Sequence, residues 1–319
     1  MKVLGIECTA HTLGIGIVDK EKILANEMDT YKPPKGEGMI PRDLADHHAK
    51  VFSAVLRRAL KKAKLGMKDI SLIAFSQGPG IGAPLSVGCA GAKFLAAKYK
   101  KPIVGVNHCQ AHLEIAKEYS RFSSPLFLYI SGGNSQIVLK EKTGYHVLGE
   151  TLDMGIGNLF DSFARSIGLE SHGSVLEKFS KGGKYIELPY TVKGMNLVFS
   201  GLLTHAQKLA KSHSKKDIAY SLMENSFAMT CEATERALFL TKKKSLVVCG
   251  GVAQNKRLQN MLKKMCKDDN IEFYVAPDEL NRDNGAMIAY TGYIIRKKSK
   301  KKGIEKIAPR PNYRIDAIQ

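Results

Sequence analysis

Two strand–turn–strand patterns, separated by about half of the chain, restrict the possible folds more than any other feature. The first pattern has β-rich runs at residues 2–7 and 14–19 on either side of a polar turn, 8–12. The second occupies residues 125–141 and has its small polar turn, Ser-Gly-Gly-Asn-Ser, at 131–135. Short β-rich runs joined by a polar turn predict antiparallel strands. The chain is therefore expected to contain two similar sheet hairpins.

Each hairpin is followed by the elements of a layered α/β structure. After the first come a third strand, a charged helix, an apolar strand, a glycine loop and a second helix, predicted at 22–28, 43–64, 70–76, 78–82 and 86–98. After the second come a helix, an apolar strand and a glycine-rich turn before another helix, the first three at 218–240, 245–249 and 250–255. This order predicts a duplicated α/β domain, with two unrelated sheet domains as the alternative.

The length of the chain suits two lobes. It has 319 residues, 44% of them apolar, which is enough for two cores of roughly 150 residues each. We place the lobes at 1–123 and 124–290, followed by a basic helix or tail at 291–319 that packs back on the first lobe. If the two polar turns face each other, their backbone N–H groups can bind phosphates from both sides. An actin-like fold of two duplicated lobes around a nucleotide-binding cleft has this layout.

The charge balance points to a polyanionic partner. The chain has 49 Lys and Arg residues against 30 Asp and Glu, a formal net charge of +19. Residues 296–310 alone contain eight basic residues against the single acidic Glu305.

The location is expected to be cytoplasmic. No apolar run approaches the roughly 18 residues of a membrane span. The N-terminal apolar run contains Glu7 and soon reaches Asp19, unlike a secretory signal. The six cysteines are scattered and include no CxxC pair, which is typical of free thiols in a reducing compartment.

Two histidines at the start of a predicted helix form a candidate metal site. His108 and His112 are four residues apart, so they lie on one helix face and can share an ion. Incidental surface histidines are the common alternative. A peptidase of the HExxH type has a glutamate directly after the first histidine as its general base, and here that residue is Cys109. The pair alone therefore does not support peptide hydrolysis.

Other candidate residues have ordinary structural explanations when each is taken alone. Asp283 precedes a predicted helix, where it is either an N-cap or a carboxylate directed into a cleft. Tyr129 shares a strand face with Ser131, where a tyrosine is usually part of the packing. Asp161 is either a cap or a ribose ligand, and the glycine-rich turn before Asn255 is either a connection or a ligand loop. Neither GxxxxGK[ST] nor GxGxxG occurs, which excludes both of those phosphate-binding motifs.

Seven short motifs follow one another along nearly the whole chain. They are GIECTAHT (5–12), NHCQAHLE (107–114), YISGGNSQ (129–136), TLDMGIGNLFDSFAR (151–165), FSGLL (199–203), GGVAQNKRL (250–258) and RDNGAMIA (282–289). This series resembles the universal tRNA threonylcarbamoyltransferase family, which includes bacterial TsaD and the catalytic subunit of the archaeal and eukaryotic KEOPS complex. Residues 10–12, Tyr129 and Asn134 resemble the archaeal type.

The resemblance implies a fold, a reaction and a set of site residues. The fold is actin/Hsp70/sugar-kinase-like (ASKHA). The reaction transfers threonylcarbamoyl from threonylcarbamoyl-AMP, at a site that also takes ATP or AMP, to N6 of the adenosine 3′ of the anticodon in tRNAs that read A-starting codons. One divalent metal ion, iron or zinc, is implied, with ligands at His108, His112, Tyr129 and Asp283. The implied substrate or nucleotide contacts are Tyr129, Ile130, Ser131, Gly132, Gly133, Asn134, Asp161, Gly173, Glu177, Gly251 and Asn255. The family's Pro-Gly-Gly-Pro stretch is shorter here, at 170–174, which affects the match at Gly173 and Glu177.

Catalysis by such a protein is expected to depend on positioning and electrostatics, with Glu7, His11 or a metal-bound water accepting the N6 proton. The implied partners are tRNA, whose phosphates the 296–310 segment would contact, a separate small kinase/ATPase subunit and other small KEOPS subunits. No kinase-like sequence follows residue 319. Helix 43–64 is a candidate docking face. Two alternatives stay open: a metal-dependent peptidase of the glycoprotease type, and a sugar-kinase-like or chaperone-like ATPase.

Overall fold

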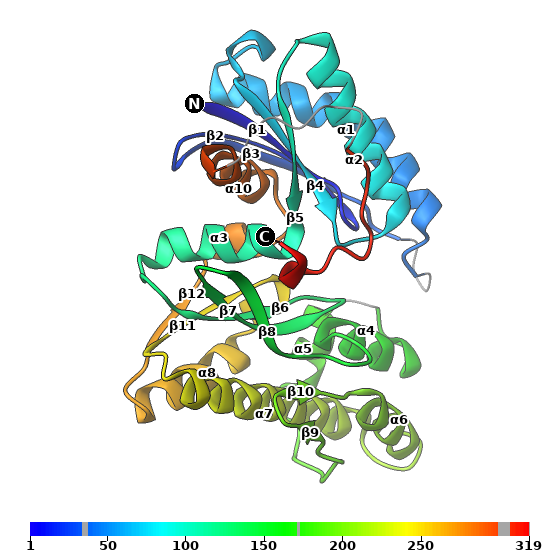
Figure 1. Ribbon diagram of the computed structural model, residues 1–319. Coiled ribbons are helices and arrows are strands. Elements are labelled where there is room, and N and C mark those ends of the chain that lie inside the picture. The colour runs from blue at the N-terminus through cyan, green and yellow to red at the C-terminus, as the bar shows by residue number, and fades with distance from the viewer. Residues whose placement is uncertain (34–37, 171–172, 299–306, 319) are drawn as a thin grey trace. The chain divides into compact units, whose positions relative to one another are not determined.

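The chain forms two compact units, each built around its own sheet (Figure 1). The computed structural model describes residues 1–33, 38–170, 173–298 and 307–318. Unit 1 contains Met1–Glu118 and Arg282–Ile318, and unit 2 contains Tyr119–Asn281.

The sheet of unit 1 has the strand order β3-β2-β1-β4-β5. Its strands are β1 (Lys2–Glu7), β2 (Thr12–Asp19), β3 (Lys22–Thr30), β4 (Leu72–Gly78) and β5 (Ile103–Asn107). The first three strands are antiparallel, while β4 pairs in parallel with β1 and β5 in parallel with β4. Helices α1 (Pro41–Ala63) and α2 (Gly82–Lys98) pack with the core that contains Leu4 and Ile6. A short helix, η1 (Met67–Asp69), precedes β4.

Helix α10 (Gly285–Lys298) packs on the sheet of unit 1 at distances that only glycine permits. A Cβ added to Gly285 would lie 2.0 Å from the backbone nitrogen of Gly16, and one added to Gly5 would lie 2.3 Å from that of Ala289. Because of this packing, residues 282–290 belong to unit 1, whereas the sequence predicts them in the second lobe. The units divide at 118/119 and 281/282, in place of the expected 123/124 and 290/291.

The last described segment, 307–318, lies at the carboxyl ends of β4 and β5. The backbone N–H of Arg310 donates to the carbonyl of Gln77 (2.7 Å), and the side-chain amide of Asn107 donates to the carbonyl of Tyr313 (2.8 Å). A short helix, η4 (Ile315–Ala317), ends it. Residues 299–306 of the expected basic segment lie outside the described residues.

The sheet of unit 2 repeats the topology of unit 1. Its order is β12-β11-β6-β7-β8, formed by β6 (Leu126–Ile130), β7 (Ser135–Glu141), β8 (Gly144–Glu150), β11 (Ser245–Cys249) and β12 (Glu272–Val275). An antiparallel hairpin with a third strand again leads to two parallel strands. The predicted duplication of an α/β domain is therefore confirmed.

Five helices of unit 2 form its core with one face of that sheet: α4 (Ile156–Ser166), α5 (Gly173–Ser180), α6 (Ser200–Leu209), α7 (Lys215–Thr241) and α8 (Lys256–Asp268). The short helix η2 (Gly251–Gln254) and the two-residue strands β9 (Val192–Lys193) and β10 (Asn196–Leu197) also contribute to it, and a further helix, α9 (Asp278–Asn281), ends the unit. Phe160 of α4 and Phe227 of α7 meet edge to face in this core, with ring centroids 5.6 Å apart.

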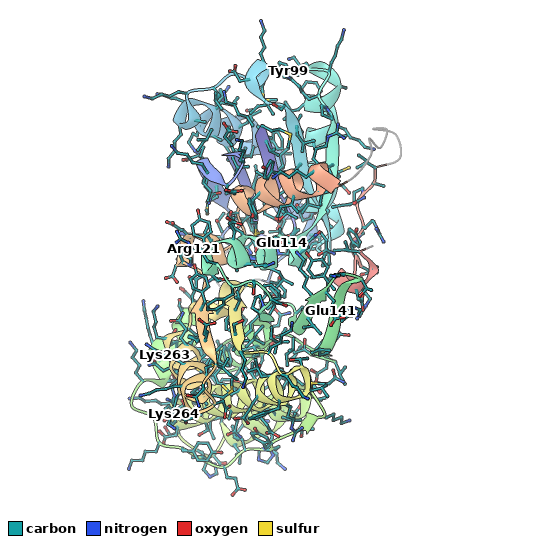
Figure 2. All side chains as sticks on the ribbon, turned by 60° about the vertical axis from the view of Figure 1, so that its left-hand side comes forward. Tyr99, Glu114, Arg121, Glu141, Lys263 and Lys264 are labelled. Carbon is teal, nitrogen blue, oxygen red and sulfur yellow. The ribbon has the colours of Figure 1, made fainter. Side chains whose placement is uncertain are left out.

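The surface of unit 2 is strongly basic along α8. Lys263 and Lys264 are exposed there (Figure 2), and Lys264 forms an ion pair with Asp268 (2.7 Å). All six cysteines are free thiols, as predicted. Within the described residues, no helix combines the length and the apolar character needed to cross a membrane.

Candidate metal centre

Helix α3 (His108–Ser120) begins directly after β5, and its first turn carries the two predicted histidines. The side-chain oxygen of Asn107 accepts a hydrogen bond from the backbone N–H of Gln110 (3.0 Å), which satisfies a donor at the start of the helix. His108 and His112 follow on one face. Their ring centroids are 4.8 Å apart and their planes are nearly perpendicular. The helical placement of the pair is therefore as expected.

Asp283 reaches these histidines from the connection between α9 and α10. The cap of α10 is the next residue, since Asn284 Oδ1 accepts a hydrogen bond from the N–H of Met287 (3.0 Å). Oδ1 of Asp283 lies 3.3 Å from Nε2 of His112 and 3.5 Å from Nε2 of His108. The ligand atoms of the three residues all lie within 4.8 Å of one another. Two imidazole nitrogens and a carboxylate oxygen suit zinc or iron, so this donor set fits the implied metal.

Burial and mutual charge shift the pKa values of all three groups. Burial favours the neutral form of His108, but the carboxylates of Glu7 and Asp283 outweigh it and raise its pKa to about 9. Burial dominates at His112 and lowers its pKa, although the hydrogen bond with Asp283 opposes this. Burial acts to raise the pKa of Asp283, but His108 and His112 hold it well below its usual range. Such opposed shifts within one cluster are typical of functional sites.

Glu7 lies on the other side of His108. Its Oε2 is 3.0 Å from Nδ1 of His108, and its Oε1 accepts hydrogen bonds from the backbone N–H (2.8 Å) and the hydroxyl (2.5 Å) of Thr9. The Glu7 side chain is fully buried. His11, the other candidate proton acceptor, is half-buried in the turn between β1 and β2. Thr9 has no distinguishing signal in the sequence beyond its place in the motif at 5–12.

The remaining candidate ligand and the small polar turn belong to unit 2. Tyr129 is buried in β6, in register with Gln136 of β7 and Cys249 of β11. The turn that follows is closed by its own polar groups: Ser131 donates from its hydroxyl to the carbonyl of Asn134 (2.9 Å), and the N–H of Asn134 donates to that hydroxyl (3.1 Å). The metal trio thus comes from unit 1, and the predicted adenylate-binding turn is in unit 2.

Helix α4 begins against this turn. The carbonyl of Gly132 accepts a hydrogen bond from the N–H of Asn158 (2.9 Å) in the first turn of α4. A Cβ on Gly157 would lie 2.5 Å from the Cα of Gly132, so the helix N-terminus approaches the backbone closely. Gly250, which directly follows β11, also lies very close to the neighbouring backbone. A Cβ on Gly250 would lie 2.3 Å from the carbonyl oxygen of Ile130, and its φ of +101° favours glycine.

The other predicted nucleotide contacts are spread over unit 2. Asp161 is half-buried in α4, Gly173 is the first residue of α5, and Glu177 is half-buried in α5. Gly251 begins η2 and is exposed. Asn255 caps α8, because its Oδ1 accepts a hydrogen bond from the N–H of Leu258 (3.1 Å).

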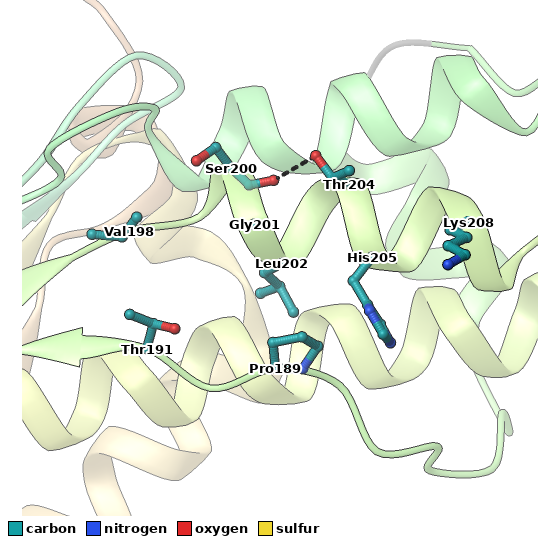
Figure 3. Close-up of a pocket in the computed structure, with 9 residues that line it drawn as sticks. All are labelled: Pro189, Thr191, Val198, Ser200, Gly201, Leu202, Thr204, His205 and Lys208. Atoms are coloured by element: carbon teal, nitrogen blue, oxygen red, sulfur yellow. Dashed lines mark hydrogen bonds between the residues drawn. The ribbon is translucent and has the colours of Figure 1, made fainter.

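The motifs at 151–165 and 199–203 are in contact at the start of helix α6. Asp153 accepts hydrogen bonds from the N–H groups of Phe199 (3.0 Å) and Ser200 (2.7 Å), which caps that helix. The hydroxyl of Thr204 donates to the carbonyl of Ser200 (3.0 Å), one turn along. Figure 3 shows a pocket beside this helix, lined by Pro189, Thr191, Val198, Ser200, Gly201, Leu202, Thr204, His205 and Lys208. It contains none of the predicted site residues, so the motif at 199–203 shapes a separate surface of unit 2.

These features define a class of protein: one of the ASKHA fold, with two duplicated α/β units and a candidate metal centre. Solved structures with this fold resemble the chain. HypF from T. kodakarensis has a TM-score of 0.65 at 14% identity, over 93% of this chain and 48% of that one. The Acidaminococcus fermentans (R)-2-hydroxyglutaryl-CoA dehydratase component A has a TM-score of 0.57 at 16% identity, over 93% and 100%. The predicted fold class is confirmed.

The family follows from sequence comparison. The family model described as TsaD, tRNA N6-adenosine threonylcarbamoyltransferase, matches residues 22–290. A protein of that name from Thermococcus sibiricus is 51% identical over 100% of this chain and 99% of its own length, and one from Nanoarchaeum equitans is 50% identical over 92% and 93%. The chain belongs to the tRNA N6-adenosine threonylcarbamoyltransferase family. This confirms the predicted resemblance and the interpretation as a transferase in tRNA modification.

Proposed function

We propose that the chain moves the threonylcarbamoyl group from threonylcarbamoyl-AMP to N6 of the adenosine 3′ of the anticodon, in tRNAs that read A-starting codons. The observation that carries the proposal is the trio of the buried His108 and His112 with the half-buried Asp283 in a member of this family. The family favours a transferase over both the peptidase and the ATPase. The residue after His108, where the peptidase motif has its glutamate, is the buried Cys109.

In this reaction, different residues of the chain would bind the metal, bind the adenylate and accept the N6 proton. His108, His112 and Asp283, with Tyr129 as a fourth ligand, would hold a divalent metal, iron or zinc. When bound, such an ion supplies a Lewis acid for oxygens of the acyl-adenylate. The backbone N–H groups of Gly132 and Gly133, in the turn beside the N-terminus of α4, would bind the adenylate phosphate, since those of Ser131 and Asn134 already donate within the turn. His11 is the candidate acceptor for the N6 proton, because it is only half-buried whereas Glu7 is fully buried.

The proposed partners are tRNA, a separate small kinase/ATPase subunit and the other small KEOPS subunits. The formal charge of +19 supports the first. The name of a relative supports the second: a protein from Methanocaldococcus jannaschii that is 46% identical to this chain is named as a probable bifunctional tRNA threonylcarbamoyladenosine biosynthesis protein.

The test is reconstitution. The chain is incubated with threonine, bicarbonate, ATP, an adenylate-forming synthase and unmodified tRNA, and the nucleosides are analysed afterwards. We expect threonylcarbamoyladenosine from the unaltered chain, none from His108→Ala, and normal amounts from the control His146→Ala, whose side chain is exposed on β8. Absence of the modified nucleoside even with the small KEOPS subunits added would contradict the proposal.

A further inference from the structure

We infer that Glu7 is a positioning residue for the metal site: its carboxylate, held by Thr9, orients His108 so that Nε2 is the nitrogen presented to the metal. This inference rests on the metal site of the proposed function. It also assigns Glu7 a different role from the proton acceptor expected from the sequence, since it acts through another residue and does not touch the substrate.

The two ring nitrogens of His108 have different surroundings. Nδ1 lies 3.0 Å from Oε2 of Glu7, whereas Nε2 lies 3.5 Å from Oδ1 of Asp283. An ionised carboxylate can only accept hydrogen bonds, so Nδ1 carries the proton and donates it to Glu7. In the neutral imidazole the lone pair that can bind a metal is then on Nε2, which lies on the same side of the ring as His112 and Asp283. The Glu7 contact therefore fixes both the tautomer and the direction of the ring.

Glu7 is itself held in place. Its Oε1 accepts hydrogen bonds from the backbone N–H and the hydroxyl of Thr9, at 2.8 and 2.5 Å, and the side chain has no exposed surface. The hydroxyl of Thr9 is also 3.4 Å from Nδ1 of His108. An adenosine amine cannot approach an oxygen that is enclosed in this way. A carboxylate that accepts a hydrogen bond from a metal-binding histidine instead restrains the ring and raises its basicity as a ligand.

The competing explanation is that the ion pair between Glu7 and His108 only stabilises the fold. A measurement of metal binding distinguishes this explanation from the positioning role. The full-length protein is stripped of metal and titrated with Co²⁺ against a competing chelator, and the visible absorption of the bound cobalt is recorded. Glu7→Gln removes the charge but keeps the shape, and Thr9→Val removes one hydrogen bond to the carboxylate. Asp19→Asn, which breaks the ion pair with the N-terminus (2.8 Å) at the far end of the same hairpin, is the control.

We expect Glu7→Gln to weaken Co²⁺ binding by about 10- to 100-fold and to change the cobalt spectrum. Thr9→Val should act in the same direction by a smaller factor, and Asp19→Asn should match the unaltered protein. If Glu7→Gln does not fold, Thr9→Val decides the question. Unchanged affinity and spectrum in the folded variants, even with reduced stability, would overturn the positioning role and leave the proposed function intact. Failure of the unaltered protein to bind Co²⁺ would overturn both the metal site and this inference.

Discussion

Nε2 of His48 lies 2.9 Å from the carbonyl oxygen of Ala10, so a buried residue of α1 holds the polar turn between β1 and β2. The His48 side chain is fully buried, and its Nδ1 has no hydrogen-bond partner within the described residues. Burial therefore lowers the pKa of His48; the hydrogen bond to Ala10 opposes this lowering, and the neighbouring His47 adds to it. The turn that carries Thr9 and His11 thus depends on a neutral histidine.

A pH dependence of stability follows from His48. Below its unfolded-state pKa of about 6.5, the unfolded chain binds a proton that folded His48 does not yet accept. The free energy of unfolding is therefore expected to fall as the pH drops through this range towards the lower folded pKa. His48→Gln can still donate to the Ala10 carbonyl but cannot titrate, so its stability should depend less steeply on pH between about 7 and 5. Urea unfolding at several pH values measures this, with the exposed His146→Gln as control. Equal slopes for His48→Gln and the unaltered protein would contradict the prediction.

Asp283→Asn tests the carboxylate of the candidate metal centre. The substitution keeps the shape of the side chain but removes the charge that faces both histidines. We expect retention of zinc or iron to fall by about 100-fold or more, with a parallel loss of transferase activity, since a charged ligand is worth at least as much as the groups that support it. Metal content after dialysis is the measurement, and Asp278→Asn, at the exposed start of α9, is the control. An Asp283→Asn variant that kept its metal and activity would remove Asp283 from the site.

The close packing of α10 predicts a steric effect at Gly16. A Cβ at this position would lie 2.2 Å from the backbone nitrogen of Ala286, so the helix or the sheet must shift. Gly16→Ala should therefore lower the free energy of unfolding by about 1–3 kcal/mol or more. Gly201→Ala is the matched control. Among the described residues, no atom outside its own stretch of helix lies within 4 Å of its added Cβ, and alanine in a helix should be neutral or stabilising by up to about 1 kcal/mol. Denaturant titration of both variants gives the comparison, and similar values for the two would contradict the packing argument.

The sequence predicted the duplicated sheets because strand alternation and polar turns are local signals. It predicted that His108 and His112 lie on one helix, because the i, i+4 spacing fixes one helix face, while their role as metal ligands stays a prediction. It could not predict the unit boundaries, since the docking of α10 on β1, β2 and β3 depends on contacts between segments more than 250 residues apart. One example is the bond from the N–H of Ala286 to Oδ1 of Asn26 in β3. The sequence also could not show whether Glu7 accepts the substrate proton or orients His108. The burial of Glu7 and the hydrogen-bond partners of its two oxygens decide between these roles, and both are set by tertiary packing.

The resemblance to the family predicts Asn255 as a nucleotide contact, and in the structure Asn255 is the N-cap of α8. Two substitutions distinguish the capping role from nucleotide binding. Asn255→Ala removes the acceptor for the N–H of Leu258 and should cost about 1 kcal/mol of unfolding free energy. Asn255→Ser retains an N-cap oxygen and should recover most of that stability. If Asn255 also contacts the nucleotide, AMP affinity measured by calorimetry should stay reduced in the serine variant. Recovery of both stability and affinity by serine would leave the cap as its whole role.

The basic residues of the C-terminal segment predict how tRNA binding responds to salt. Each phosphate contact that releases a counterion adds about 0.7 to 0.9 to the negative slope of log K against log salt. Replacing Lys300, Lys301 and Lys302 together by serine should therefore reduce the slope by up to about 2 to 3 and weaken binding at low salt. Fluorescence anisotropy with labelled unmodified tRNA, from about 50 to 200 mM salt, measures this.

A triple serine variant of Lys263, Lys264 and Lys267 on α8 removes the same charge from another surface. If the α8 variant loses as much slope as the C-terminal one, overall charge and not this segment drives tRNA binding; if the C-terminal variant keeps the original slope, the segment makes no phosphate contacts.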